Sequence, residues 1–525
     1  MKRFNVTGTC YADKHYMVDI RERLEIIAQM VGRGDYFCIN AGRQYGKTTT
    51  LHQLKKKLDA DYCVFSISFE GLSERAFESI ECLGYRFIQL LMDCIDFDEV
   101  RNLSPRVLEI MQQSLDANNG EILGDRLSVL ISKMSKFSEK PIVLIIDEVD
   151  QAGNFPVFLK FLGLLRELFL KRDARPTFQS VILAGVYDIK NLKLKIRPES
   201  EHQYNSPWNI AAQFEVDMAL PAVGIEGMIA EYKTDHTGIP EADCMNPHEM
   251  AQLIFDYTSG YPFLVSRLCQ ILDETKLRWD KAGFLAALKV LYLEKNTLFD
   301  DMMKKLDDFP ELSNMLQAIL YRGESFTYNP YNKAFNLAKM FGYILPNANG
   351  KAVISNRIFE TMLYNYFSSK EESSKIFSEG AIDKNQFIKD SQIDMDHLLS
   401  RFATHFNDIY GKNDDAFVEK TGRKLFLLYL KPIINGIGNY YIEAQTRDET
   451  RTDVIIDYLG HQYIIELKIW RGNAYNERGE AQIAGYLDLY HAKKGYLVSF
   501  CFNKNKEPGT KTIQVGDKTV IEAVI

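Results

Sequence analysis

The sequence predicts an α/β protein in which a parallel-sheet domain is followed by a mainly helical region and then by a second α/β domain. Between residues 36 and 187, short β-rich runs alternate with longer helical patterns, which is typical of a parallel sheet. Near the other end of the chain, residues 451–470 predict two apolar strands around a glycine. The 525 residues, 46% of them hydrophobic, are enough for several domains with real cores.

The first sheet is expected from four apolar runs whose near-continuous hydrophobicity indicates strands covered on both faces. These runs are YFCIN (36–40), CVFSISF (63–69), IVLII (142–146) and SVILAGV (180–186). The pattern becomes mainly helical from about residue 225, and one helix is expected to open at Pro262, where proline suits a first turn. Residues 335–367 read as a helix, a small hairpin and another helix, an order that resembles a winged helix.

A polar stretch, SSKEESSKIFSEG (368–380), predicts an exposed connection before the second α/β domain. We therefore expect four parts, with these boundaries: a sheet domain at 1–224, a helical and winged-helix-like region at 225–367, a linker at 368–395 and a second α/β domain at 396–525.

Composition restricts the class of protein. A net charge of −8 argues against wholesale coating of nucleic acid, although a local groove could still be basic. The richest apolar stretch, 155–170, is interrupted by Lys160, Arg166 and Glu167, and the N-terminus lacks the apolar core of a secretory signal. We expect a cytoplasmic protein with no membrane contact. Because cysteines and histidines are dispersed, any metal should be bound by oxygen.

A loop that contains two glycines follows the first strand and leads into a helix, in the stretch AGRQYGKTTTLHQL. Glycine lets the backbone approach a phosphate, and amides at a helix N-terminus point toward anions. We expect Gly42, Gly46, Lys47, Thr48 and Thr49 to bind ATP, with Lys47 on the β- and γ-phosphates and the Thr48 hydroxyl on Mg²⁺. The pattern G-x-x-x-x-G-K-[ST] has glycine where this chain has an alanine at position 41, so we predict a slightly altered loop.

Two acids end the third predicted strand. Asp147 can hold Mg²⁺ at the carboxyl end of a buried strand, and Glu148 can polarise the attacking water. Helix-capping acids ahead of residues 155–170 are the alternative. The strand CVFSISF between the two motifs favours the additional-strand type of P-loop ATPase. Arg197 is a candidate arginine finger and Arg267 a candidate phosphate sensor, with ordinary surface arginines as the alternative.

The hairpin at 451–470 places two carboxylates against each other. If Leu459 and Gly460 form a two-residue turn, facing positions sum to 919, so Asp453 lies opposite Glu466, and Lys468 shares the face of Glu466. Like charges in facing positions destabilise a sheet. A divalent cation between the carboxylates, a proton held on one of them, or a register slip would each resolve this conflict.

The spacing D-x12-E-x-K suits phosphodiester cleavage, which needs Mg²⁺ to activate water and a cation to orient the nucleophile. Solvated charges on an edge strand are the alternative. Glu419, near the start of a helix predicted over 414–430, is a further candidate acid. Gln482 and Tyr486 are four apart in a helix predicted over 480–490, hence on one face, and GYLVSF (495–500) supplies another strand.

Together, Glu419, the R-x-D of 451–453, the I-E-L-K of 465–468 and the Q-x-x-x-Y of 482–486 resemble the PD-(D/E)XK nuclease superfamily, in its branch with a Q-x-x-x-Y helix. With FNVTGTCYADKHYMVDI and GRQYGKTTTL at the front, nearly the whole chain resembles bacterial proteins that join an AAA-ATPase-like domain to a PD-(D/E)XK domain.

This resemblance implies that Asp453 and Glu466 bind Mg²⁺, or Mn²⁺, that Lys468 is the catalytic lysine, that Glu419 is an accessory acid, and that Gln482 and Tyr486 contact the phosphate or metal. Thr452 stands where the superfamily has proline. We predict an ATP-hydrolysing protein whose nucleotide state controls a Mg²⁺-dependent nuclease acting on DNA, with RNA as a second candidate substrate. A nucleotide-dependent switch that binds nucleic acid or protein without cleaving is the alternative. AAA-like modules often form rings, which leaves a homo-oligomer open.

Overall fold

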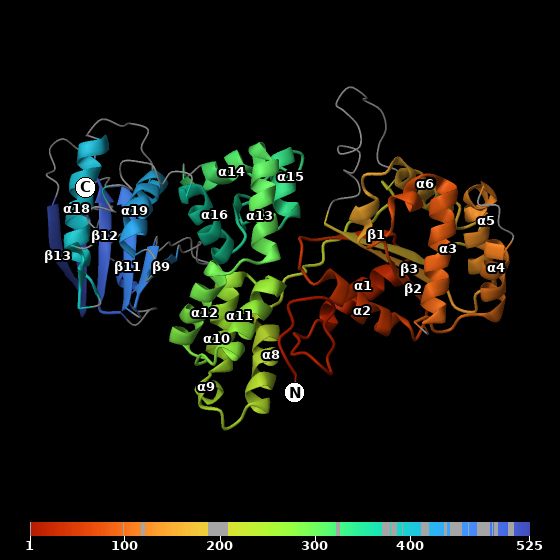
Figure 1. Ribbon diagram of the computed structural model, residues 1–525, viewed down its shortest axis with the longest axis horizontal. Coiled ribbons are helices and arrows are strands. Elements are labelled where there is room, and N and C mark those ends of the chain that lie inside the picture. The colour runs from red at the N-terminus through yellow and green to blue at the C-terminus, as the bar shows by residue number, and fades with distance from the viewer. Residues whose placement is uncertain are drawn as a thin grey trace. The chain divides into compact units, whose positions relative to one another are not determined.

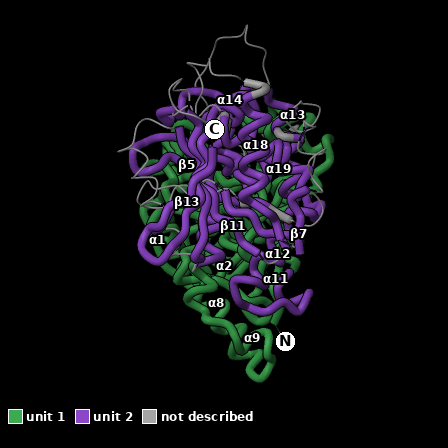
Figure 2. Tube along the Cα trace, turned by 90° about the vertical axis from the view of Figure 1, so that its left-hand side faces the viewer, with its two compact units in different colours: residues 1–252, 260–270 green, residues 253–259, 271–525 purple. Residues whose placement is uncertain are grey.

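The computed structural model divides the chain into two compact units (Figure 2), residues 1–252 with 260–270 and residues 253–259 with 271–525. The described residues are 2–97, 99–116, 121–186, 208–321, 326–369, 379, 386–390, 392–410, 419–434, 438–441, 454–459, 461–469, 483–485, 487, 492–501 and 509–525. The four-part division expected from the sequence remains a prediction. Along the chain, the last boundary between the two units falls after residue 270, within helix α11 (Pro262–Glu274).

The described strands of the first unit form a four-stranded, wholly parallel sheet in the order β1-β4-β3-β2 (Figure 1). Their bounds are β1 Phe37–Asn40, β2 Cys63–Ser68, β3 Ile142–Asp147 and β4 Ser180–Gly185. All four match the runs predicted from the sequence. The strand CVFSISF lies between the two nucleotide motifs in sequence, but β2 is at the sheet's edge. The strand that separates β1 from β3 in space is β4.

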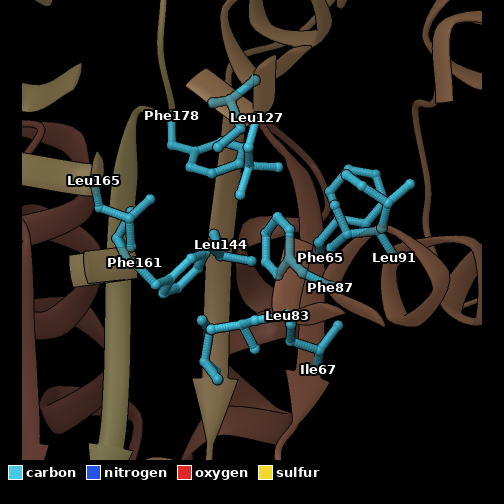
Figure 3. Close-up of a cluster of buried hydrophobic side chains, with 14 of the residues drawn as sticks. Phe65, Ile67, Leu83, Phe87, Leu91, Leu127, Leu144, Phe161, Leu165 and Phe178 are labelled. Carbon is cyan, nitrogen blue, oxygen red and sulfur yellow. The ribbon is translucent and has the colours of Figure 1, made fainter. Parts of the chain in front are cut away.

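Helices cover both faces of this sheet because the strands carry apolar side chains on both faces. On one face Leu24, Ile27, Leu51 and Leu54 pack with strand residues such as Ile145. On the other, Phe65 and Leu144 from the strands meet Phe87, Leu91 and Phe161 from helices (Figure 3). The helical elements up to β4 are α1 Arg21–Gly32, α2 Lys47–Leu58, η1 Glu74–Phe77, α3 Ile80–Asp96, α4 Pro105–Asp116, α5 Glu121–Phe137, η2 Val149–Ala152 and α6 Pro156–Leu170.

Further helices follow, as the sequence predicted: α8 Ala222–Asp235, α9 Pro240–Asp243, α10 Pro247–Thr258, α11 Pro262–Glu274, α12 Lys281–Leu293, α13 Thr297–Asp308 and α14 Pro310–Tyr321. The helix predicted to open at Pro262 does so. The helix–hairpin–helix predicted over 335–367 is confirmed as α15 Lys333–Met340, β5 Ile344–Pro346, β6 Ala352–Ile354 and α16 Arg357–Ser369.

The C-terminal part of the second unit is a sheet whose described strands run β13-β14-β12-β11-β10-β9. Their bounds are β9 Gly438–Tyr441, β10 Val454–Tyr458, β11 His461–Ile469, β12 Lys494–Phe500, β13 Gly509–Val515 and β14 Lys518–Val524. Strands β11, β12 and β14 are mutually parallel, and β9, β10 and β13 run against their neighbours. The sequence predicted β10, β11 and β12 but not the flanking strands.

This sheet is also covered on both faces. Helices α18 (Met395–Tyr410) and α19 (Glu419–Ile434) pack on one, where Phe402 contacts Phe426 and Phe406 contacts Phe500 of β12 (Figure 1). Ile483 and Leu487 pack on the opposite face against strand residues. Within the predicted linker, β7 (Ile388–Lys389) and β8 (Gln392–Ile393) form a short hairpin. None of the described helices is long and apolar enough to cross a bilayer.

Candidate functional sites

The loop between β1 and α2 encloses a lysine. Gly46 lies just before α2 in the left-handed region, with φ +77°, a conformation that glycine adopts without the steric cost of a side chain. The Lys47 ammonium, 6% exposed, donates to the carbonyl oxygens of Ala41 and Gly42 at 3.0 Å each. Burial lowers the pKa of Lys47, and the carboxylates of Glu148, Asp150 and Asp147 oppose that shift. The alanine at position 41, where the motif has glycine, therefore does not prevent the loop from enclosing the Lys47 ammonium.

The two predicted nucleotide motifs meet at the carboxyl edge of the sheet. The Thr48 hydroxyl donates to Asp147 Oδ2 at 2.8 Å, and Asp147 Oδ1 accepts from the Glu148 amide at 2.9 Å. Glu148 itself has a φ of +52°, uncommon for a non-glycine residue. Burial, and next the Asp147 charge, raise the pKa of the Glu148 carboxyl. A hydroxyl and a carboxylate in contact are oxygen ligands of the kind that Mg²⁺ prefers, so these residues fit the ion.

Residues outside the motifs also contact the loop, and the sequence alone did not identify them. The Tyr261 hydroxyl, just before α11, donates to the Arg43 carbonyl at 2.5 Å, and its ring meets Tyr45 edge-on with centroids 4.6 Å apart. Pro262 lies beside Gly46, because a Cβ built on Gly46 would be 3.7 Å from Pro262 Cγ. The start of α11 is therefore packed on the phosphate-binding loop.

The remaining predicted residues of this unit have other surroundings. The Thr49 hydroxyl accepts a hydrogen bond from the Cys10 amide at 3.1 Å, which ties the N-terminal segment to the start of α2. Arg267 donates to Gln270 Oε1 at 2.8 Å within α11. Arg197 lies outside the described residues.

In the C-terminal sheet, the predicted hairpin register is confirmed over its described pairs. Val454 faces Ile465 and Tyr458 faces His461, so facing positions sum to 919, and Leu459 of the turn has a φ of +52°. Asp453, Gln482 and Tyr486 lie outside the described residues. Glu419 is the first residue of α19.

Glu466 and Lys468 lie in the middle of the sheet on β11. The Glu466 carboxylate is 1% exposed, and its Oε1 lies 3.3 Å from Lys468 Nζ. Glu466 shares a face with Ile464, which packs against Ile483 and Leu487. Ile483 and Leu487 therefore pack on the sheet face that carries Glu466. The alternative of solvated charges on an edge strand is wrong for Glu466 and Lys468, because β11 is an inner strand and the Glu466 side chain is buried.

The same face carries a second buried carboxylate that sequence reasoning missed. Lys468 is paired with Ser499 of β12, whose hydroxyl donates to Glu522 Oε1 at 2.9 Å. Glu522, on β14, is fully buried, and its Oε2 lies 2.7 Å from Lys511 Nζ. Charged and hydroxyl side chains thus run across β11, β12, β14 and β13. No motif spacing marked Glu522 or Ser499, since the register of these strands joins residues far apart in sequence.

The parallel sheet, its loop closed around Lys47 and the Thr48–Asp147 contact define the first unit as a P-loop nucleotide-binding fold. Consistent with this class, residues 37–192 match the family model of an AAA domain. No match is found among the curated proteins.

Solved structures that the chain resembles include two from Aeropyrum pernix. The Orc1 protein in complex with DNA matches with 12% identity and a TM-score of 0.30, covering 68% of this chain and 94% of that one. The Orc2 protein in its ADP form matches with 11% identity and a TM-score of 0.35, covering 70% of this chain and 96% of that one.

Proposed function

We propose that this protein binds and hydrolyses ATP through its first unit and cleaves phosphodiester bonds, in DNA, through its C-terminal sheet. The observation that carries the first half is the meeting of Lys47, Thr48, Asp147 and Glu148 at one edge of the parallel sheet. The second half is supported by the buried Glu466 carboxylate and the Lys468 ammonium beside it, on an inner strand of the other sheet.

In the nucleotide site, Lys47 would exchange its two carbonyl contacts for phosphate oxygens, which are stronger acceptors for an ammonium. Thr48 and Asp147 would hold Mg²⁺, which neutralises charge on the phosphates when bound. Glu148, whose raised pKa makes its carboxylate a better proton acceptor, would orient the attacking water.

In the second site, Asp453 and Glu466 would hold Mg²⁺ or Mn²⁺, which supplies positive charge to the scissile phosphate when bound. The fit rests on the donor chemistry of Glu466, because carboxylate oxygens are the ligands that Mg²⁺ prefers. Lys468 keeps its ammonium 3.3 Å from Glu466 and would orient the nucleophile. Glu419, Gln482 and Tyr486 remain proposed accessory residues, the last two near the phosphate or metal.

The test is a cleavage assay on single- and double-stranded DNA and RNA, in Mg²⁺ or Mn²⁺ and with or without ATP. We expect the wild type to nick DNA and the double variant Asp453→Ala/Lys468→Ala to lose nicking. The matched control is Lys494→Ala, which removes a lysine of β12 that is ion-paired to Asp396. A wild type that cleaves none of these substrates would eliminate the nuclease half of the proposal.

The same assay distinguishes the nuclease from the alternative function. In that alternative, the protein is a nucleotide-dependent switch whose C-terminal sheet only binds a partner. In that case nucleic acid would be retained without cleavage, and Lys468→Ala would alter binding at most. ATP turnover by the first unit is tested separately, so failure of one half leaves the other standing.

A further inference from the structure

Glu466 shares its row of the C-terminal sheet with a second buried carboxylate. Glu466 is paired with Leu497 of β12, and Leu497 is paired in turn with Glu522 of β14. Paired residues of parallel strands point to the same face, and neighbouring strands lie about 4.8 Å apart. Glu522 therefore lies on the face of Glu466, two strands away. Because Glu522 is fully buried, its partners must offset the desolvation of its charge.

Each oxygen of the Glu522 carboxylate has a different partner. Oε2 lies 2.7 Å from Lys511 Nζ, and Oε1 accepts from the Ser499 hydroxyl at 2.9 Å. Lys511 belongs to β13, the outermost of the described strands on that side of the sheet, and its side chain is 54% exposed. The charge of Glu522 is thus compensated from the edge of the sheet, and the carboxylate is held with one oxygen toward Ser499.

The Ser499 hydroxyl lies beside Lys468. The two residues are paired across β11 and β12, so their side chains share one face. A hydroxyl has one hydrogen to donate and two lone pairs that accept, whereas an ammonium only donates. The Ser499 hydrogen is donated to Glu522. Toward Lys468 the Ser499 oxygen is therefore an acceptor, which is the polarity that an ammonium requires.

The Lys468 ammonium shares its carboxylate partner with the proposed metal. Its Nζ lies 3.3 Å from Glu466 Oε1, and only 12% of the Lys468 side chain is exposed. When Glu466 holds a divalent cation, that cation and the ammonium repel each other. Lys468 then needs another acceptor, and its low exposure leaves little room for water. Ser499, with the charge of Glu522 behind it, can accept from the neighbouring strand.

We propose that Ser499 and Glu522 are positioning residues, which hold the Lys468 ammonium in place when Glu466 is occupied by a cation. Ser499 accepts from the ammonium, Glu522 fixes the direction of the Ser499 hydroxyl, and Lys511 fixes Glu522. None of the three needs to touch the substrate. The inference rests on the proposed function in that Lys468 is the lysine of the proposed nuclease.

Glu522→Gln tests this arrangement with little change of shape. The amide nitrogen of glutamine is a donor, so it avoids the Lys511 ammonium and turns toward Ser499. The Ser499 oxygen then accepts from the amide, and its own hydrogen turns away from position 522, toward Lys468. The variant thus keeps a hydrogen bond between positions 499 and 522 but reverses its direction.

The first measurement is the rate of DNA nicking by full-length protein in Mg²⁺, at a series of DNA concentrations. Glu522→Gln and Ser499→Ala should each lower kcat by about 100-fold with KM nearly unchanged, the loss expected when a catalytic group is displaced by about 1 Å. Ser499→Thr keeps a hydroxyl and should recover most of the activity that Ser499→Ala loses. The matched control, Asp396→Asn, removes a carboxylate paired with Lys494 of β12 and should match the wild type.

The second measurement needs neither metal nor DNA. Full-length protein in EDTA is labelled with a trace of acetic anhydride, and mass spectrometry gives the rate of acetylation at Lys468. In a Glu466→Gln background the ammonium has lost its charged partner, so Ser499 and Glu522 should keep it from the reagent. Adding Glu522→Gln to that background should speed acetylation of Lys468 by at least about fivefold, the effect of losing one ordinary hydrogen bond.

Equal acetylation of Lys468 in the Glu466→Gln variant with and without Glu522→Gln would overturn the inference. Wild-type kcat in Glu522→Gln would also overturn it, as would a loss in Ser499→Thr as large as that in Ser499→Ala, which would indicate damage to packing. A wild type that cleaves nothing refutes the proposed nuclease, and the acetylation rates then decide alone whether these residues hold Lys468.

Discussion

Gly260 allows a direct test of how the start of α11 is packed on the phosphate-binding loop. Its φ is +72°, and a Cβ added there would lie 2.1 Å from the backbone oxygen of Leu220, with the Leu220 amide also hydrogen-bonded to the Gly260 carbonyl at 2.8 Å. Backbone atoms cannot rotate away as a flexible side chain can. Gly260→Ala must therefore move the chain just before Tyr261 and Pro262, the two residues that contact the loop.

The magnitude follows from two separable costs. A non-glycine residue in the left-handed region costs about 1–2 kcal/mol, and forcing extra volume into a packed site costs about 1–3 kcal/mol more. We expect Gly260→Ala to lower the free energy of unfolding by about 2–5 kcal/mol. Gly238 is the matched control, because its φ is +89° but an added Cβ would meet nothing within 4 Å. Gly238→Ala should lower the free energy of unfolding only by the backbone cost of about 1–2 kcal/mol.

The assay is urea unfolding of both variants followed by circular dichroism, together with titration of a fluorescent ATP analogue. We expect Gly260→Ala to unfold at lower urea and to bind the analogue more weakly, while Gly238→Ala keeps wild-type affinity. Equal stability losses in the two variants would refute the clash with Leu220. Wild-type nucleotide affinity in a destabilised Gly260→Ala would refute the claim that this turn supports the loop.

Four further outcomes are expected. Lys47→Ala should lower ATP affinity by about 100-fold, since a charge-assisted hydrogen bond contributes about 1.5–3 kcal/mol. Unchanged affinity in a direct titration would show that the lysine does not bind the nucleotide. Glu148→Gln should bind ATP normally but reduce turnover by about 10²–10⁴-fold, as loss of a general base does; wild-type phosphate release would remove this role. Lys468→Ala should end DNA nicking in Mg²⁺ as completely as chelation with EDTA does, a result that residual nicking in a gel assay would contradict. Ser499→Ala should destabilise the second unit by about 1–3 kcal/mol because Oε1 of the buried Glu522 carboxylate loses the hydrogen bond from the Ser499 hydroxyl, and an unchanged thermal transition would argue against it.

Much of the first unit could be predicted because its strands and its nucleotide motif are each encoded by residues adjacent in the sequence. A buried parallel strand is an uninterrupted apolar run, so β1, β2, β3 and β4 could be read directly. Lys47 and Thr48 follow glycine in a fixed spacing that requires no knowledge of tertiary structure. The spatial order of the strands was not predictable in this way, because β4 lies between β1 and β3 only through pairings across the chain.

The C-terminal sheet shows more clearly which features cannot be predicted from the sequence. The hairpin register between β10 and β11 depends on a two-residue turn, so it could be derived from adjacent residues. Strand β13 is mostly exposed along its length and lacks the apolar run that marks a strand. Glu522 lies in β14 with no motif around it, and only the β12–β14 register brings it to Ser499. Contacts of this range are set by packing rather than by local sequence.

Both candidate sites lie where the chain departs from ordinary packing and backbone rules. Glu148 holds a left-handed backbone without being glycine, and such conformations persist only where the surrounding structure enforces them. Glu466 and Lys468 occupy an inner strand where an apolar pair of similar volume would avoid the desolvation of two charges. Neither feature is required to form a helix or a sheet. These two departures, at the carboxyl edge of one sheet and at the centre of the other, are the observations on which the two halves of the proposed function rest.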